Sequence, residues 1–140
     1  AMAGKKTIII GADLRKPKLF DDFGLTNEKG LSGYLSGLVL LKEIIQRTNI
    51  EHLDVISGGP VPPNPSELLL NSRMDEMISK LKETYDFILM DTPPLALITD
   101  GLVLAKYADH TVYIVRQNYT PREVLQNAND IFVTGKIAHL

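Results

Sequence analysis

Aspartates placed just after apolar runs are the residues of this sequence whose types and spacing could do chemistry. Asp91 ends the run FILMD and precedes two prolines, and Asp13 follows the run TIII after two small residues. Arg15 and Lys16 come directly after the Asp13 turn. Carboxylates beside cations suit a phosphate and its Mg²⁺, which commonly takes one or two carboxylates together with substrate phosphates. The spacing also fits a plainer interpretation, in which Asp13 caps a turn and the two cations are solvated.

The elements that must position these residues alternate between strands and helices. Short apolar or β-branched runs, typical of parallel strands covered on both faces, predict strands over residues 7–10, 53–57, 87–91 and 111–115. Apolar spacing and capping residues predict helices over residues 31–38, 40–47, 65–85, 99–108 and 121–134. This order predicts an α/β fold with a doubly wound, mainly parallel sheet flanked by helices. Because ligands bind at the carboxyl ends of such strands, Asp13 and Asp91 are expected at one edge.

Composition narrows the class of protein but does not identify a partner. The 140 residues fit one domain, and 44% hydrophobic residues with a formal net charge of −2 are typical of a globular protein. Neither sign of charge is in the excess that would indicate nucleic acid, so we expect no nucleic-acid partner. The absence of cysteine excludes disulfides and thiolate metal sites. No run approaches the ~18 apolar residues of a membrane span.

Three longer motifs resemble one family. TIIIGADLRKPKL resembles the second nucleotide motif of the bacterial tyrosine kinases that regulate capsule and exopolysaccharide synthesis, the Wzc-like family within the MinD/ParA-type P-loop ATPases. FILMDTPP resembles their Walker B motif, and GGPVPPNPSELLLNSRM resembles the proline-rich loop and helix between the two. The motifs occur in the family's order and span nearly the whole chain. The resemblance implies a P-loop NTPase-like fold, with ATP and Mg²⁺ as cofactors of the complete domain.

The resemblance also implies roles for particular residues. Asp13 corresponds to a catalytic, Mg²⁺-associated and nucleotide-binding residue of the second motif. Asp91 corresponds to the Walker B carboxylate, which acts on the Mg²⁺ of the bound nucleotide. Arg15 and Lys16 correspond to the basic residues that follow the catalytic aspartate.

Two departures from the family pattern affect this interpretation. The sequence has no G-x-x-x-x-G-K-[ST] pattern, whose backbone N–H groups and lysine surround the phosphates. We therefore expect residues 1–140 to form a single partial kinase or ATPase domain, an internal piece that is incomplete at its N-terminal edge. Gly11 stands where family members often carry another acidic residue, which leaves one carboxylate in the motif.

The resemblance predicts part of the cytoplasmic catalytic domain of a protein-tyrosine kinase. Its expected acceptors are tyrosines of its own chain or of neighbouring subunits, with homo-oligomers as the assembly. A membrane protein of polysaccharide export is the expected partner. We expect a location at the inner face of the bacterial plasma membrane, through another part of the protein or through this partner. The alternatives are a MinD/ParA-type ATPase switch and a non-catalytic interaction module of the export machinery.

Overall fold

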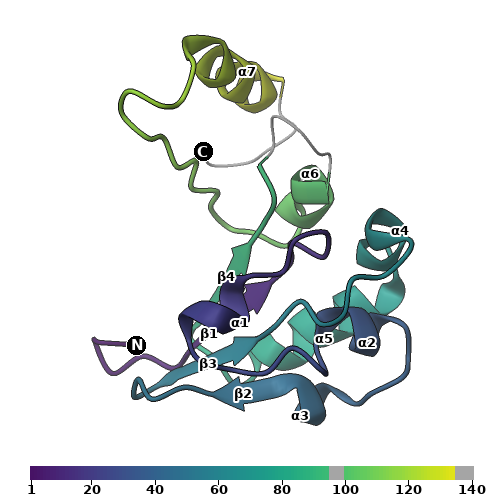
Figure 1. Cartoon of the computed structure of the whole chain (residues 1–140). Coiled ribbons are helices and arrows are strands. Elements are labelled where there is room, and N and C mark those ends of the chain that lie inside the picture. The colour runs from purple at the N-terminus through teal and green to yellow at the C-terminus, as the bar shows by residue number, and fades with distance from the viewer. Residues whose placement is uncertain (95–99, 135–140) are drawn as a thin grey trace. The chain divides into compact units, whose positions relative to one another are not determined.

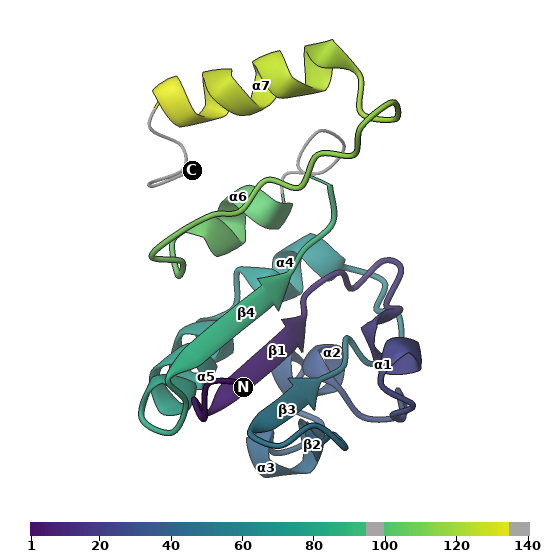
Figure 2. The ribbon, with the colours of Figure 1, turned by 90° about the vertical axis from the view of Figure 1, so that its left-hand side faces the viewer.

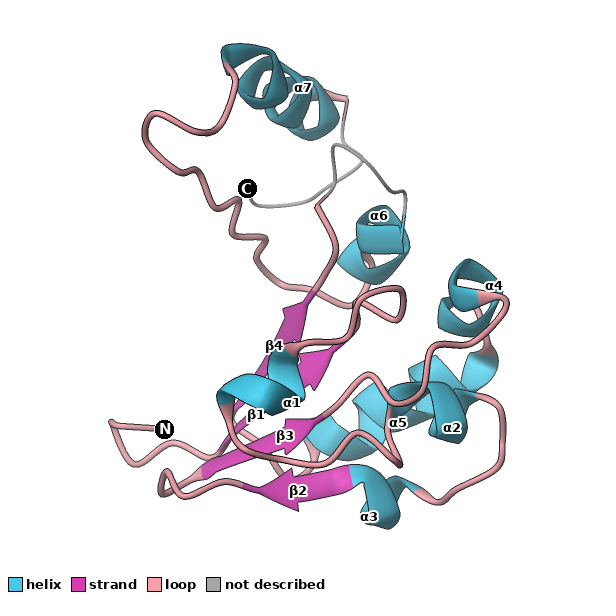
Figure 3. Ribbon diagram, viewed as in Figure 1, coloured by secondary structure: helices cyan, strands magenta, loops and turns pink. Residues whose placement is uncertain are grey.

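The computed structural model describes residues 1–94 and 100–134 and divides into two compact units, Ala1–Thr92 and Pro93–Leu140. The first unit contains all the strands found in the described residues (Figures 1 and 3). In chain order its elements are β1 (Thr7–Gly11), α1 (Leu19–Asp22), α2 (Leu31–Leu35), α3 (Leu41–Ile44), β2 (Ile45–Arg47), β3 (Leu53–Ile56), α4 (Pro65–Leu69), α5 (Ser72–Lys82) and β4 (Phe87–Asp91).

The four strands form one sheet in the order β2-β3-β1-β4. The central strand β1 is parallel to β3 on one side and to β4 on the other, with Thr7 opposite Leu53 and Phe87 (Figure 2). Strand β2 is antiparallel to β3 at one edge. The mixed, mainly parallel sheet confirms the predicted α/β class, and β1, β3 and β4 confirm three of the four predicted strands.

The core of the first unit lies between the sheet and the helices α2, α4 and α5, which cover one of its faces (Figure 2). Ile8 and Ile10 of β1 are fully buried. The apolar stripe of α5 recurs at helical spacing, and its members are at most 5% exposed: Met74, Met77, Ile78 and Leu81. Burial of each such side chain stabilises the fold by roughly 1.5–3 kcal/mol, so this layer fixes the strands that carry the two aspartates.

Strand β4 forms the other edge of the sheet, and its burial alternates along the chain. Phe87 and Leu89 are 57% and 50% exposed, whereas Ile88 and Met90 are half-buried. Asp91 continues the exposed row, because successive side chains of a strand point to opposite faces.

Three predicted helices of the first unit differ from the structure. The helix expected over residues 31–38 ends at Leu35, as α2. The helix expected over residues 65–85 is divided into α4 and α5, because Asn71 begins a new helix by accepting a hydrogen bond from the Arg73 N–H at 3.0 Å. The helix expected over residues 40–47 ends at Ile44, and its last residues form β2 instead. Pairing with β3 places these residues in the sheet and overrides their helical spacing.

The described part of the second unit contains α6 (Asp100–Ala105) and α7 (Arg122–Val133). These helices confirm the two expected over residues 99–108 and 121–134, although α6 already ends at Ala105 and α7 spans only Arg122–Val133. Residue 99 lies outside the described residues. The strand predicted over residues 111–115 is wrong, because this segment is an irregular loop in which Val112 and Ile114 are more than 80% exposed. In the described residues no strand pairs with this run, and β-branched residues favour a strand mainly when they are paired in a sheet. Among the described residues, no helix is both long and apolar enough to span a membrane.

Candidate functional site

Asp13 lies in the loop after β1, at the carboxyl end of that strand. Its Oδ1 accepts hydrogen bonds from the backbone N–H groups of Arg15, at 3.1 Å, and Lys16, at 3.0 Å. Leu14, between them, is only 2% exposed and anchors the loop in the core. The turn-capping interpretation of Asp13 is therefore correct. The same turn also holds the carboxylate at a defined place beyond the end of the strand. A carboxylate that acts on a bound phosphate and its metal must be held in this way as well.

Asp91 reaches the same edge of the sheet at the end of β4. Gly11 is its register partner on β1, and the Ala12 N–H donates to the Asp91 carbonyl oxygen at 2.8 Å. The pKa of the Asp91 carboxyl is raised, first by its partial burial and then by the negative charges of Asp13 and Asp22. The two carboxylates predicted to share an edge are therefore close enough to repel each other.

The chemistry of this pair fits a divalent cation. Carboxylates that repel each other are stabilised by a cation between them or beside them. Mg²⁺ takes oxygen ligands and commonly uses only one or two carboxylates, with water and phosphate oxygens completing its shell. In residues 1–94 and 100–134, no three His, Asp or Glu side chains gather into a complete ligand set. Asp13 and Asp91 thus suit a metal that arrives together with a phosphate ligand.

The negative charge of Asp22 also raises the Asp91 pKa, and the positions of the strand ends in the sequence do not predict this effect. Asp22 belongs to the short helix α1, nine residues after Asp13 in the sequence. The adjacent acidic pair in LFDDFG is the only signal in the sequence, and the spacing does not say towards which edge the helix turns.

The basic residues of the Asp13 loop are exposed, and one of them contacts a distant segment. Arg15 Nη2 donates to the Ser66 hydroxyl at 2.8 Å, although 51 residues separate the two. Ser66 is the second residue of α4, within the proline-rich motif. Lys16 and Lys18 are exposed on the same loop. The structure places Arg15 and Lys16 at this edge of the sheet, as expected from their adjacency to Asp13, whereas no motif in the sequence indicates the contact with Ser66.

The loop after β3, residues 57–60, is joined to residues 27–32 by six hydrogen bonds of 2.7–3.1 Å. These run from Leu31 N to Ser57 O, Ser32 N to Gly58 O, Ser32 Oγ to Pro60 O, Asn27 Nδ2 to Gly59 O, Gly59 N to Asn27 Oδ1, and Ser57 Oγ to Lys29 O. Glycine allows this close approach, because a Cβ at Gly30 would lie 2.3 Å from Gly59 N.

The other side of the same loop supports the Asp13 turn. A Cβ at Gly58 would lie 2.8 Å from Pro17 Cβ and 3.4 Å from the Asp13 carbonyl oxygen. A Cβ at Gly11 would lie 3.3 Å from Gly58 N. The loop therefore packs tightly between residues 27–32 and the turn that presents the carboxylate.

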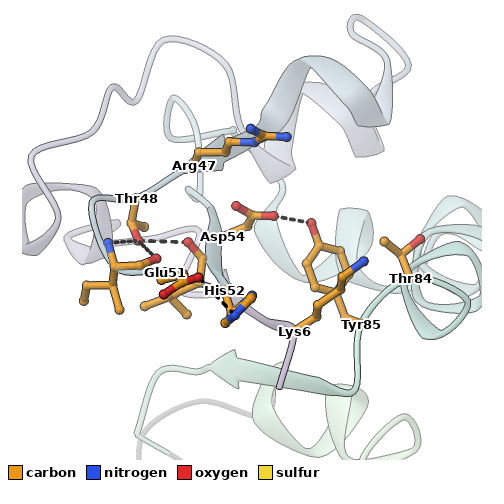
Figure 4. Close-up of a pocket in the computed structure, with 10 residues that line it drawn as sticks. Lys6, Arg47, Thr48, Glu51, His52, Asp54, Thr84 and Tyr85 are labelled. Atoms are coloured by element: carbon orange, nitrogen blue, oxygen red, sulfur yellow. Dashed lines mark hydrogen bonds and ion pairs between the residues drawn. The ribbon is translucent and has the colours of Figure 1, made fainter. Parts of the chain in front are cut away.

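A pocket of about 450 Å³ lies at the opposite, amino-terminal ends of β1 and β3 (Figure 4). In it the Tyr85 hydroxyl donates to Asp54 Oδ2 at 2.7 Å, and the Tyr85 pKa is raised, mainly by burial and then by this bond. Lys6, at the start of β1, also lines it. Because β1 extends roughly 3.3 Å per residue, the five residues of this strand separate the pocket from the two aspartates.

Comparison with known proteins finds similar bacterial tyrosine-protein kinases. No family model matches the chain. The chain is 37% identical over 136 residues to the tyrosine-protein kinase YwqD of Bacillus subtilis, and 40% identical over 139 residues to the putative tyrosine-protein kinase CapB of Staphylococcus aureus. It covers 57% and 61% of these relatives. Its fold matches the chimerical protein CapA2B2 with a TM-score of 0.93 at 33% identity, covering 99% of this chain and 61% of the other.

The chain resembles bacterial tyrosine-protein kinases over nearly its whole length. The kinase domain of Escherichia coli tyrosine kinase ETK matches with a TM-score of 0.92 at 30% identity, over 99% of this chain and 54% of that one. The septum site-determining protein MinD of Pyrococcus horikoshii, which was crystallised with Mg-ADP, matches with a TM-score of 0.76 at 20% identity and shows the fold alone. These matches confirm the resemblance to bacterial tyrosine kinases and the P-loop NTPase-like fold. The roles of Asp13, Arg15, Lys16 and Asp91 stay predictions.

Proposed function

We propose that the chain is part of the cytoplasmic catalytic domain of a protein-tyrosine kinase, which transfers the γ-phosphoryl group of ATP to tyrosine hydroxyls and regulates capsular or exopolysaccharide synthesis and export. The observation that carries the proposal is a pair of strand-end carboxylates, Asp13 and Asp91, beside a basic loop. This pair occurs in a chain that is 37–40% identical to named tyrosine kinases over nearly its full length. The chain spans about three-fifths of those relatives, so the activity concerns the whole protein.

We infer different roles for the two carboxylates. Mg²⁺ bound with ATP supplies neutralisation of the phosphate charge, and Asp13 and Asp91 are the residues that would hold it. Asp13 accepts the proton of the attacking tyrosine hydroxyl, because Gly11 leaves the motif without a second carboxylate. Arg15 and Lys16, fixed in the same turn, stabilise the negative charge of the transferring phosphoryl group.

The proposal extends to the surroundings of the kinase. The acceptors are tyrosines of the same chain or of neighbouring subunits, in a homo-oligomer. The partner is a membrane protein of polysaccharide export, and the location is the inner face of the bacterial plasma membrane. A relative encoded in a cps region, a putative tyrosine-protein kinase of Klebsiella pneumoniae, is 41% identical over 125 residues and supports this setting.

The acceptor of the phosphoryl group distinguishes this proposal from a MinD/ParA-type ATPase switch. The kinase transfers the group to tyrosine, whereas the ATPase would transfer it to water and produce free phosphate. The better structural matches favour the kinase, since the TM-score falls from 0.93 for CapA2B2 to 0.76 for MinD. The test is incubation of the complete gene product with γ-labelled ATP and Mg²⁺, followed by phosphoamino-acid analysis. We expect label in phosphotyrosine. Label found only in free phosphate would support the ATPase and refute the kinase.

A further inference from the structure

We propose that Ser66 is a positioning residue for the phosphoryl-transfer site, which directs the guanidinium of Arg15 through its hydroxyl. The inference rests on the proposed function and adds to it a residue from the proline-rich motif. The hydrogen bond from Arg15 Nη2 to Ser66 Oγ, at 2.8 Å, is the direct contact that carries it.

The Arg15 end of this contact is fixed at its backbone. The Arg15 N–H is bonded to the Asp13 carboxylate, and the buried side chain of Leu14 anchors the loop one residue earlier. Two residues later, Pro17 packs against the close-fitting loop at Gly58. The turn therefore sets where the Arg15 side chain starts but not where its guanidinium points.

The Ser66 end is fixed by the helix that carries it. Pro65 occupies the first position of α4, where its fixed φ suits a helix start. Leu68 and Leu69 bury the other side of this turn, being 9% and 0% exposed. Asn64 Nδ2 donates to Glu67 Oε2 at 2.9 Å across the helix start. The Ser66 hydroxyl is thus held at a defined point by a short helix whose far side is buried.

A hydrogen bond between two fixed segments restricts the rotamers of the arginine side chain that makes it. An arginine loses rotamer entropy when it is ordered, and a guanidinium ordered in advance does not lose it during the reaction. Arg15 also starts at the turn that presents the Asp13 carboxylate. Ser66 therefore links the proline-rich motif to Arg15, which stabilises charge next to the proton acceptor Asp13.

The test is a double-mutant cycle on tyrosine phosphorylation by the complete gene product, with kcat and the KM for ATP measured for each variant. Because a net hydrogen bond contributes roughly 0.5–1.5 kcal/mol, Ser66→Ala should lower kcat about 2- to 10-fold. Ser66→Thr, which keeps the hydroxyl, should restore most of kcat. Ser79→Ala, on the exposed face of α5, is the control and should leave kcat unchanged.

The arginine background distinguishes positioning from a structural effect. In an Arg15→Ala protein, Ser66→Ala should cause no further loss, because its effect passes through the guanidinium. Wild-type kcat in Ser66→Ala, or an equal loss in both backgrounds, would overturn the inference while leaving the kinase proposal intact. A wild-type protein that labels no tyrosine would overturn the proposed function, and the inference with it.

Discussion

Gly30→Ala is the substitution for which the structure makes the sharpest stability prediction. A Cβ at this position would lie 2.3 Å from Gly59 N, 2.5 Å from Ser57 O and 2.6 Å from Gly59 Cα. All three atoms belong to backbone, so no side chain can rotate away to make room. The segments on both sides of the contact must separate.

The size of the effect follows from the separation required. The shortest contact is 1.1 Å below the 3.4 Å at which ordinary van der Waals contact begins. A movement of that size would lengthen the bonds from Leu31 N and Ser32 N, now 2.8 Å and 2.9 Å, beyond hydrogen-bonding distance. Two lost bonds at roughly 0.5–1.5 kcal/mol each, with roughly 1–3 kcal/mol of overpacking, predict a destabilisation of about 2–6 kcal/mol.

Urea unfolding followed by circular dichroism measures the loss, and amide hydrogen exchange at Leu31 and Ser32 locates it. Gly33→Ala is the matched control, because its Cβ would meet only Val39 Cγ2, at 3.3 Å, and alanine favours the helix α2. We expect the control to be neutral or slightly stabilising. A Gly30→Ala protein within 0.5 kcal/mol of wild type, with unchanged exchange at both amides, would refute the close approach of the two segments.

Two further substitutions test the electrostatics of the chain. Because the folded-state pKa of Asp91 is raised, its charge destabilises the fold at neutral pH. Asp91→Asn should therefore be more stable than wild type at pH 7, with a difference that shrinks as the pH falls towards the ordinary value of 3.8; a constant difference in unfolding free energy across that range would contradict this. Tyr85→Phe removes the donor to Asp54 and should cost about 1–2 kcal/mol, whereas Tyr119→Phe, at a 74% exposed residue, should cost nothing measurable in the same unfolding assay.

The strands that carry the aspartates could be predicted because each is a short apolar run. Residues 7–10, before Asp13, and residues 87–91, which end at Asp91, indicate strands from composition alone, although β4 is exposed along one side and not buried as expected. Because the two strands pair in parallel, their carboxyl ends meet at one edge. Strand β2 could not be predicted this way, since its residues continue a helical pattern and only pairing with β3 decides their conformation. The break between α4 and α5 had a local signal in Asn71, a residue that favours helix starts.

The candidate site was predictable where it depends on strand ends and not where it depends on distant contacts. Asp13 and Asp91 follow from topology, and the basic residues follow from their adjacency to Asp13. The Ser66 contact crosses 51 residues, and the influence of Asp22 depends on the direction of a four-residue helix. No periodicity and no motif in the sequence predicts either the Ser66 contact or the effect of Asp22.

The most direct test of the central claim is tyrosine phosphorylation by an Asp13→Asn variant of the complete gene product. The amide keeps the shape of the side chain but removes its charge and basicity, and Gly11 offers no second carboxylate. We predict at least a ~10²-fold loss of labelled phosphotyrosine, the lower end of what a positioned acid–base group contributes. Circular dichroism checks that the variant is folded. Labelling close to the wild-type level by a folded Asp13→Asn protein would contradict the assignment of this edge of the sheet as the site of phosphoryl transfer.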